Sequence, residues 1–411
     1  MKPMGPIPPG FAADARGRLV IAGHDVEALV AHAGDTPLFV YDLDLVERRV
    51  ARLRAAMPAG LGVHYAIKAN PAPALLAGMA ALVDGFDIAS RGELARALDA
   101  GVAAGRISFA GPGKRDDELE AAIAAGCTIN LESEGEAARA LAIATRLGRR
   151  PRLAVRVNPD FDLKGSGMRM GGGAKPFGVD AERVPALVSA IVAAGADYRG
   201  LHIYAGSQAL DPLAIIETQR LTIALARRIA RDSGVAAPLV NLGGGFGVPY
   251  FAGDRDLDVA AIGAALAAEI GEEAGRYAIE LGRWLVAEAG VYLARVIDRK
   301  ISHGKTFLIT DGGLHHQLAA SGNFGTVVRR NYPVAVATRY GAPAGEEASV
   351  VGCLCTPLDR LADEIGLPHA VPGDIIAVFL AGAYGASASP SAFLGHFPAR
   401  ELTVRAETLL S

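Results

Sequence analysis

Eight short apolar runs constrain the fold of this chain more than any other feature of its sequence. Between Leu43 and Gly282 they alternate with longer stretches of helical period, a pattern typical of repeated strand and helix units. The runs are Gly62–Ile67, Gly85–Ala89, Ile107–Ala110, Thr128–Leu131, Arg152–Val157, Gly200–Tyr204, Leu239–Leu242 and Tyr277–Glu280. Because eight parallel strands close a β/α barrel, we predict a (β/α)8 TIM barrel over residues 43–283.

The pattern changes after the barrel and predicts a second domain. β-branched runs are now separated by Gly, Pro and His instead of by long helices. These runs are Val291–Ile297, Thr306–Thr310, Val334–Ala337 and Ile375–Phe379. We therefore predict a C-terminal β domain over residues 284–411. Residues 1–42 contain another strand candidate, Leu38–Tyr41, and we expect this N-terminal segment to pack with the β domain.

Composition favours small-molecule chemistry in the cytoplasm. The net charge of −3 over 411 residues removes the electrostatic argument for a nucleic-acid or membrane partner. Prolines interrupt the first ten residues, and no run of 18 uncharged apolar residues follows, so we expect neither a signal peptide nor a membrane span. The 3 cysteines are too few for a disulfide framework.

Reactive groups in such a barrel lie just past the C-terminal ends of the strands. Lys68 follows the first run, Ser207 the sixth, and Glu280 and Arg283 mark the end of the eighth. The apolar neighbours of Lys68 predict that its ammonium form is disfavoured, which makes it a usable amine nucleophile for a carbonyl. A lysine that extends to the barrel rim is an equally supported alternative from position alone.

A glycine run, Gly243-Gly-Gly-Phe-Gly247, follows the seventh strand and offers backbone N–H groups suited to a phosphate. It is not a dinucleotide fingerprint, because Val248 stands where the third glycine is needed. A tight packing turn is the ordinary alternative.

The histidines and cysteines do not predict a metal site. His315-His316 and Cys353-Leu-Cys355 match no zinc spacing and have no second pair. His64 and His202 lie within strand runs, where a core histidine is the usual explanation. We therefore predict no metal.

Taken together, these residues resemble the fold-type III pyridoxal-phosphate-dependent decarboxylases, the ornithine and diaminopimelate decarboxylase family, over nearly the whole chain. The shared motifs, in the family's order, are Tyr65-Ala-Ile-Lys68-Ala-Asn70, Phe86-Asp-Ile-Ala-Ser90 with Glu93, Ala205-Gly-Ser-Gln208, Gly243-Gly-Gly-Phe246, Glu280-Leu-Gly-Arg283, Cys355 with Asp359, and Gly382-Ala-Tyr384-Gly385. The resemblance implies an alanine racemase-like barrel with a β domain, bound pyridoxal 5'-phosphate, and a head-to-tail homodimer with shared active sites.

The resemblance also implies roles for individual residues. Lys68 would hold the cofactor as a Schiff base, Glu280 would pair with its pyridine nitrogen, and Cys355 of the other subunit would protonate Cα. A carboxylate beside the ring nitrogen favours its protonated form, which is the better electron sink. The remaining cofactor-binding residues implied are Asp87, Tyr204, Ser207, Gly244, Gly245, Arg283 and Tyr384.

This chain departs from the family pattern at residues that are expected to contact the cofactor ring and the substrate. Tyr204 stands where many relatives have a histidine that stacks on the ring. Thr356 stands where relatives place the Asp or Glu that binds a distal ammonium, and a hydroxyl cannot supply that pairing. Further candidates on the substrate side are Asp359, Arg329, Arg330 and Tyr332.

We therefore hypothesise decarboxylation of an amino acid other than free ornithine, lysine or diaminopimelate. Gly111-Pro-Gly-Lys114 and Ala319-Ala-Ser-Gly-Asn-Phe324 are similar to the branch associated with exosortase systems and to decarboxylases of carrier-bound or conjugated amino acids. A conjugated substrate needs a wide entrance, and we expect the glycine-rich stretch Lys164–Gly178 to border it.

Three alternatives remain from the sequence. The first is an ornithine- or diaminopimelate-type decarboxylase of a free amino acid. The second is a racemase, but racemases of this fold place an arginine at the ring nitrogen, whereas this chain has Glu280. The third is a non-catalytic regulatory homologue, which we would expect to lack Lys68 or Cys355.

Overall fold

The computed structural model describes residues 1–411 except 164, 166, 170, 323–329, 407 and 411. The chain divides into two compact units. The barrel unit comprises residues 50–247 and 257–282, and the β unit comprises residues 1–49, 248–256 and 283–411. The boundary at residue 49 lies inside helix α2 (Leu43–Ala56).

The barrel unit is a closed ring of parallel strands. They are β5 (Gly62–Ala66), β6 (Gly85–Ile88), β7 (Ile107–Phe109), β8 (Thr128–Leu131), β9 (Arg152–Asn158), β12 (Asp197–Ile203), β14 (Leu239–Asn241) and β15 (Tyr277–Leu281). The ring closes because β15 pairs with β5, with Glu280 opposite His64. Each of the eight predicted runs coincides with one of these strands, so the predicted barrel is confirmed.

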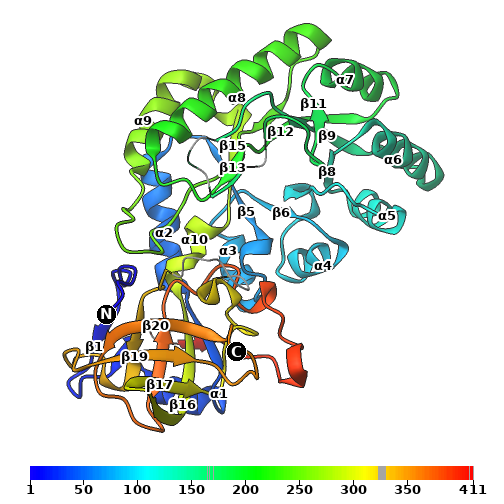
Figure 1. The fold of residues 1–411 in the computed structure, drawn as a ribbon. Coiled ribbons are helices and arrows are strands. Elements are labelled where there is room, and N and C mark those ends of the chain that lie inside the picture. The colour runs from blue at the N-terminus through cyan, green and yellow to red at the C-terminus, as the bar shows by residue number, and fades with distance from the viewer. Residues whose placement is uncertain (164, 166, 170, 323–329, 407, 411) are drawn as a thin grey trace. The chain divides into compact units, whose positions relative to one another are not determined.

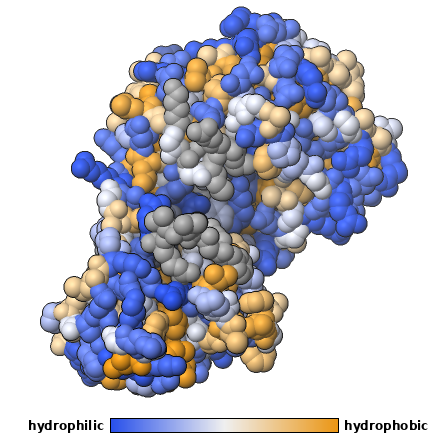
Figure 2. All heavy atoms as spheres, viewed as in Figure 1, coloured by the Kyte–Doolittle hydropathy of each residue, from blue (hydrophilic) through white to orange (hydrophobic). Residues whose placement is uncertain are grey.

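Helices lie outside the strands, as the ribbon shows for α4 to α7 (Figure 1). Their bounds are α3 (Pro73–Ala80), α4 (Arg91–Asp99), α5 (Asp116–Ala125), α6 (Glu134–Leu147), α7 (Val184–Ala193), α8 (Pro212–Ser233) and α9 (Val259–Ile270). Side-chain caps fix several starts: the Ser90 hydroxyl accepts from the Glu93 N–H, and Ser133 does the same for Glu136. Hydrophilic residues cover much of the surface around α5 and α6 (Figure 2). No helix within the described ranges is long and apolar enough to cross a membrane.

Short strands complete the barrel unit. They are β10 (Met168–Arg169), β11 (Val179–Asp180) and β13 (Gly206–Ser207). The β10–β13 pairing places Met168 opposite Ser207, so this part of the glycine-rich stretch lies against the segment that carries Ser207. Residues 164, 166 and 170 of that stretch are outside the described residues.

The β unit is a predominantly antiparallel sheet in the order β20-β19-β17-β16-β4-β22-β23, with β21 and β18 branching from β16. The N-terminal β4 lies between β16 and β22. The strands are β1 (Ala12–Ala13), β2 (Leu19–Ile21), β3 (His24–Asp25), β4 (Leu38–Asp42), β16 (Gly290–Ser302), β17 (Lys305–Thr310), β18 (Val334–Val336), β19 (Glu346–Val351), β20 (Arg360–Leu367), β21 (Ile375–Val378), β22 (Arg400–Arg405) and β23 (Thr408–Leu410), and the helices are α1 (Val26–Ala33) and α10 (Arg283–Val286).

Alternation along β4 explains why the N-terminal segment belongs to this sheet. Leu38 and Val40 are buried in a core with Val291 and Leu293 of β16. The intervening Phe39 points to the opposite face, where its ring lies 4.9 Å from that of Tyr292. A strand with both faces buried cannot stand alone, so the N-terminal segment is part of the β unit's core.

Candidate active site

Lys68 lies at the C-terminal end of β5, in a single turn over Ile67–Ala69. It lines a cavity of about 310 Å³ together with Asp87, Glu93, Arg156 and Glu280, all at the C-terminal end of the barrel. Its amine lies 5.5 Å from the centre of the Tyr204 ring. The expectation of an apolar environment for Lys68 is wrong: its neighbours in the chain are buried, but its own side chain is exposed.

Glu280 is a buried carboxylate held by a histidine. The Nε2 atom of His202 on β12 lies 2.8 Å from a carboxylate oxygen of Glu280 on β15, and both residues are buried. Burial raises the pKa of Glu280, but the hydrogen bond and charge of His202, with the charges of Lys68 and Arg156, lower it to about 2. Glu280 is therefore an anion at neutral pH, in the cavity that Lys68 lines.

Asp87 forms a second pair with a barrel histidine. Its carboxylate lies 3.2 Å from Nδ1 of His64, and its other oxygen is buried without a hydrogen-bond partner in the part of the chain that the structure describes. Burial lowers the pKa of His64, but the charge and hydrogen bond of Asp87 outweigh it and raise this pKa overall. The cavity therefore holds two carboxylates that are each backed by a histidine.

The glycine run packs too closely for side chains. A Cβ atom on Gly244 would lie 1.9 Å from the Glu280 carbonyl oxygen, and one on Gly245 would lie 2.7 Å from the Gly206 carbonyl oxygen. Gly245 also has φ +90°, a conformation that favours glycine. The run therefore lies between the Glu280 strand and the segment that carries Ser207, packed so closely that only glycine fits at Gly244 and Gly245.

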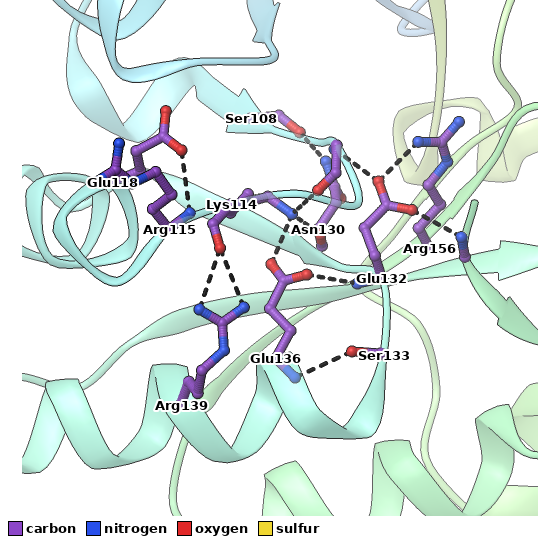
Figure 3. Close-up of polar contacts among 12 residues, drawn as sticks. Ser108, Lys114, Arg115, Glu118, Asn130, Glu132, Ser133, Glu136, Arg139 and Arg156 are labelled. Carbon is purple, nitrogen blue, oxygen red and sulfur yellow. Dashed lines mark hydrogen bonds and ion pairs between the residues drawn. The ribbon is translucent and has the colours of Figure 1, made fainter. Parts of the chain in front are cut away.

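A buried network of charges lies beside the cavity, which its members Lys114 and Arg156 line. Figure 3 shows the polar contacts of this network. The Lys114 amine donates to a Glu136 oxygen at 2.6 Å and to the Asn130 carbonyl at 2.8 Å. The Arg156 guanidinium donates to Glu132 at 2.7 Å. Each of these buried charges thus has an opposite charge beside it, and this side of the cavity is polar.

The β unit contains a guanidinium within an aromatic cluster. Arg283 donates to the Tyr250 hydroxyl at 2.9 Å, and its carbon Cζ lies 4.7 Å from the centre of the Tyr384 ring. Tyr332 stacks on Tyr250 with ring centres 4.7 Å apart. The Nε atom of Arg283 is buried and has no hydrogen-bond partner among the described residues. The Arg283 guanidinium is therefore suited to bind an anion.

Cys355 lies on the loop between β19 and β20, and its side chain is exposed. Thr356 follows it and accepts a 3.4 Å hydrogen bond from the Leu358 N–H. Asp359 is buried, and its carboxylate accepts from the Leu314 and Leu354 N–H groups at 2.7 and 2.8 Å. Arg329 lies outside the described residues, whereas the Arg330 guanidinium is 3.9 Å from the Phe251 ring centre.

The predicted residues therefore fall into two groups, one in each unit. The barrel unit holds Lys68, Asp87, Tyr204, Ser207, Gly244, Gly245 and Glu280. The β unit holds Arg283, Tyr332 and Tyr384 in the aromatic cluster, and Cys355, Thr356 and Asp359 on the loop between β19 and β20. Sequence reasoning missed His202, which it assigned to the core, and also Arg156. Alternation within the two strands was the available signal, because both side chains face the same interior as Glu280.

Comparison with known proteins agrees with this geometry. A family model described as pyridoxal-dependent decarboxylase, pyridoxal binding domain, matches residues 43–294. The chain therefore belongs to the pyridoxal-dependent decarboxylases.

Two characterised relatives and one solved structure illustrate the similarity. The L-glutamyl-(BtrI acyl-carrier protein) decarboxylase of Niallia circulans is 37% identical over 88% of this chain and 87% of its own length. The 2-((L-alanin-3-ylcarbamoyl)methyl)-2-hydroxybutanedioate decarboxylase of Staphylococcus aureus is 30% identical over 90% of this chain and 94% of its own. The crystal structure of Helicobacter pylori diaminopimelate decarboxylase complexed with L-lysine has a TM-score of 0.82 at 28% identity, covering 93% of this chain and 95% of that one.

Proposed function

We propose that this chain uses pyridoxal 5'-phosphate to remove the α-carboxylate of an amino-acid unit that is carried in a larger conjugate, such as an amino acid attached to a carrier protein. The observation that carries the proposal is the Glu280 anion, held by His202 in the cavity that Lys68 lines. The cofactor carries an aldehyde, which binds an amine, and a pyridine nitrogen, which pairs with a carboxylate. An amine and a fixed carboxylate that line one cavity meet both needs.

The residues present fit this cofactor. Gly244 and Gly245 leave backbone free of Cβ atoms beside Ser207, as a phosphate group needs. The buried Nε of Arg283, which lacks a partner within the described ranges, can donate to the same kind of anion. We assign Lys68 as the amine that binds the aldehyde.

When bound, pyridoxal phosphate supplies an acceptor for the electrons left at Cα after carbon dioxide departs. Glu280, ionised at neutral pH, would favour a proton on the ring nitrogen of the cofactor, which would strengthen that acceptor. Tyr204 offers an aromatic face near Lys68. The Cys355 thiol then donates the proton that replaces the lost carboxylate at Cα.

A conjugated substrate is favoured by Thr356 and by the relatives. Thr356 carries no charge for the distal ammonium of a free diamino acid. The two characterised relatives described above are named for a carrier-bound glutamyl group and for a carbamoyl conjugate. A free diamino acid is the second candidate, because the similar Helicobacter pylori structure is a diaminopimelate decarboxylase with bound L-lysine.

We further propose a head-to-tail homodimer in which Cys355 of one subunit serves the Lys68 site of the other. Mixing the Lys68→Ala and Cys355→Ala proteins, each inactive alone, should then restore part of the activity, because hybrid dimers contain one complete site. Mixtures that stay inactive while forming hybrid dimers would contradict a shared site.

The substrate proposal is tested by measuring carbon dioxide release from free, acylated and carrier-bound amino acids with the reconstituted enzyme. We expect release from a carrier-bound or conjugated amino acid, with Lys68→Ala as the inactive control. Turnover of free lysine, ornithine or diaminopimelate with a Michaelis constant in the micromolar to millimolar range would instead support the second candidate. Deuterium exchange at Cα without carbon dioxide release would indicate a racemase.

A further inference from the structure

The β unit brings together three side chains that suit a transition-metal ion. His315 lies between β17 and β18, Cys353 follows β19, and His396 follows a short turn near the C-terminus. One nitrogen or sulfur atom from each lies within 4.8 Å of the others. The Cys353 sulfur is 3.9 Å from both ring nitrogens of His396, and the His315 and His396 ring centres are 5.0 Å apart.

His315 is the observation that points to a ligand. Its side chain is 0% exposed, and neither ring nitrogen has a hydrogen-bond partner among the residues that the structure describes. Buried polar groups are almost always paired, so a buried imidazole with two unpaired nitrogens requires an explanation. The adjacent His316 shows the ordinary situation, with Nδ1 3.1 Å from the Tyr292 hydroxyl and Nε2 2.8 Å from the Phe397 carbonyl.

The surroundings hold the three side chains in place. The buried Asp359 carboxylate accepts hydrogen bonds from the N–H groups of Leu314 and Leu354. Leu314 directly precedes His315, and Leu354 directly follows Cys353. His316 binds the carbonyl of Phe397, next to His396. Hydrogen-bonded neighbours that orient ligand-bearing loops are typical of metal sites.

We propose that His315, Cys353 and His396 bind Zn²⁺, with the fourth tetrahedral position open to water. Zn–S and Zn–N bonds of about 2.3 and 2.0 Å give a sulfur-to-nitrogen distance of about 3.5 Å in a tetrahedron. To reach it, the His396 ring must turn one nitrogen toward the ion, because both nitrogens lie 3.9 Å from the Cys353 sulfur, and the three ligand atoms, now within 4.8 Å of one another, must draw together. Cys353 binds as the thiolate, so its proton is released to solvent when the Zn–S bond forms.

Such an ion would tie the C-terminal segment to the loop that carries Cys355, two residues beyond Cys353. The site lies wholly in the β unit, and it does not depend on the proposed decarboxylation.

The test is zinc analysis of the full-length, cofactor-loaded enzyme after incubation with Zn²⁺ and dialysis into metal-free buffer. We expect one zinc per chain, and its loss in Cys353→Ser and in His396→Ala. Cys127→Ser, Cys355→Ser and His32→Ala are the matched controls and should keep the zinc. X-ray absorption at the zinc edge should show one sulfur at about 2.3 Å and two nitrogens at about 2.0 Å.

Three outcomes would overturn the site: no zinc retained by the wild type, zinc retained equally by Cys353→Ser, or zinc lost in Cys355→Ser. His315→Ala removes a buried side chain and can affect folding, but His396 is exposed, so His396→Ala separates lost zinc from lost structure. The circular dichroism of His396→Ala should match that of the wild type.

Discussion

Replacement of Glu136 by glutamine should destabilise the barrel unit strongly. The Lys114 and Glu136 side chains are only 1% and 2% exposed and lie 2.6 Å apart. The neighbouring carboxylate, Glu132, is already paired with Arg156. Glu136→Gln therefore leaves a buried ammonium without its own negative partner.

The size of the effect follows from this burial. Removing one partner of a buried ion pair costs about 3–5 kcal/mol, because the remaining charge stays out of water. A cooperative unit of 150–250 residues loses about 2–4 °C in Tm per kcal/mol, so the expected decrease is about 6–20 °C. Burial lowers the pKa of Lys114 and raises that of Glu136, so the intact pair adds little net stability. The double variant Lys114→Met/Glu136→Leu should consequently recover part of the loss.

Thermal unfolding followed by circular dichroism measures these changes in Tm. The matched control is Glu120→Gln, because Glu120 on α5 pairs with Arg146 on α6 at 2.9 Å with side chains 40% and 60% exposed. Glu120→Gln should lower the free energy of unfolding by only about 0–1 kcal/mol. Equal Tm values for Glu136→Gln and Glu120→Gln would refute the argument from burial.

Three further predictions concern the barrel site. Glu280→Gln should reduce kcat for carbon dioxide release about 10²–10³-fold without unfolding the protein, as judged by circular dichroism. The Glu280 contribution to stability is complete above pH 4.5 and is lost between pH 4.5 and about 2. His202→Leu removes the hydrogen bond and the charge that oppose burial most strongly and leaves only the charges of Lys68 and Arg156, so the pKa of Glu280 should rise and the acid limb of the kcat–pH profile should move towards neutrality. An unmoved limb would contradict the pairing. Gly244→Ala should weaken cofactor binding at least about tenfold in titrations, because its Cβ would overlap the Glu280 carbonyl, whereas Gly135→Ala, with ordinary contacts, should not.

The barrel could be predicted from the sequence because its signals are local. Ile107–Ala110, for example, is apolar over one strand length and coincides with β7 (Ile107–Phe109). Strands β19 and β20 were not predicted. Charged residues interrupt both strands. The place of β19 is set by parallel pairing with β17, across residues 311–345, and β20 pairs with β19 across a short loop. Pairing between distant segments leaves no periodic trace within one segment.

The same distinction between local signals and contacts of distant segments applies to the proposed active site and the proposed zinc site. Lys68 and Glu280 could be predicted because each ends a recognisable strand. Alternation within β12 could place His202 inside the barrel, but its pairing with Glu280 joins two strands that are distant in the sequence, so the partner could not be predicted. His315 and Cys353 were rejected as metal ligands on spacing, and His396 was not considered. Loops of the folded sheet bring these three residues together from separate parts of the chain.

The central claim is that Lys68 binds pyridoxal phosphate in this cavity. Reduction of the reconstituted enzyme with borohydride, followed by peptide mass spectrometry, tests it most directly. We predict one pyridoxyl adduct per chain, located on Lys68 and missing from Lys68→Ala. An adduct on another lysine, or none in a protein that is folded and cofactor-saturated, would contradict the claim.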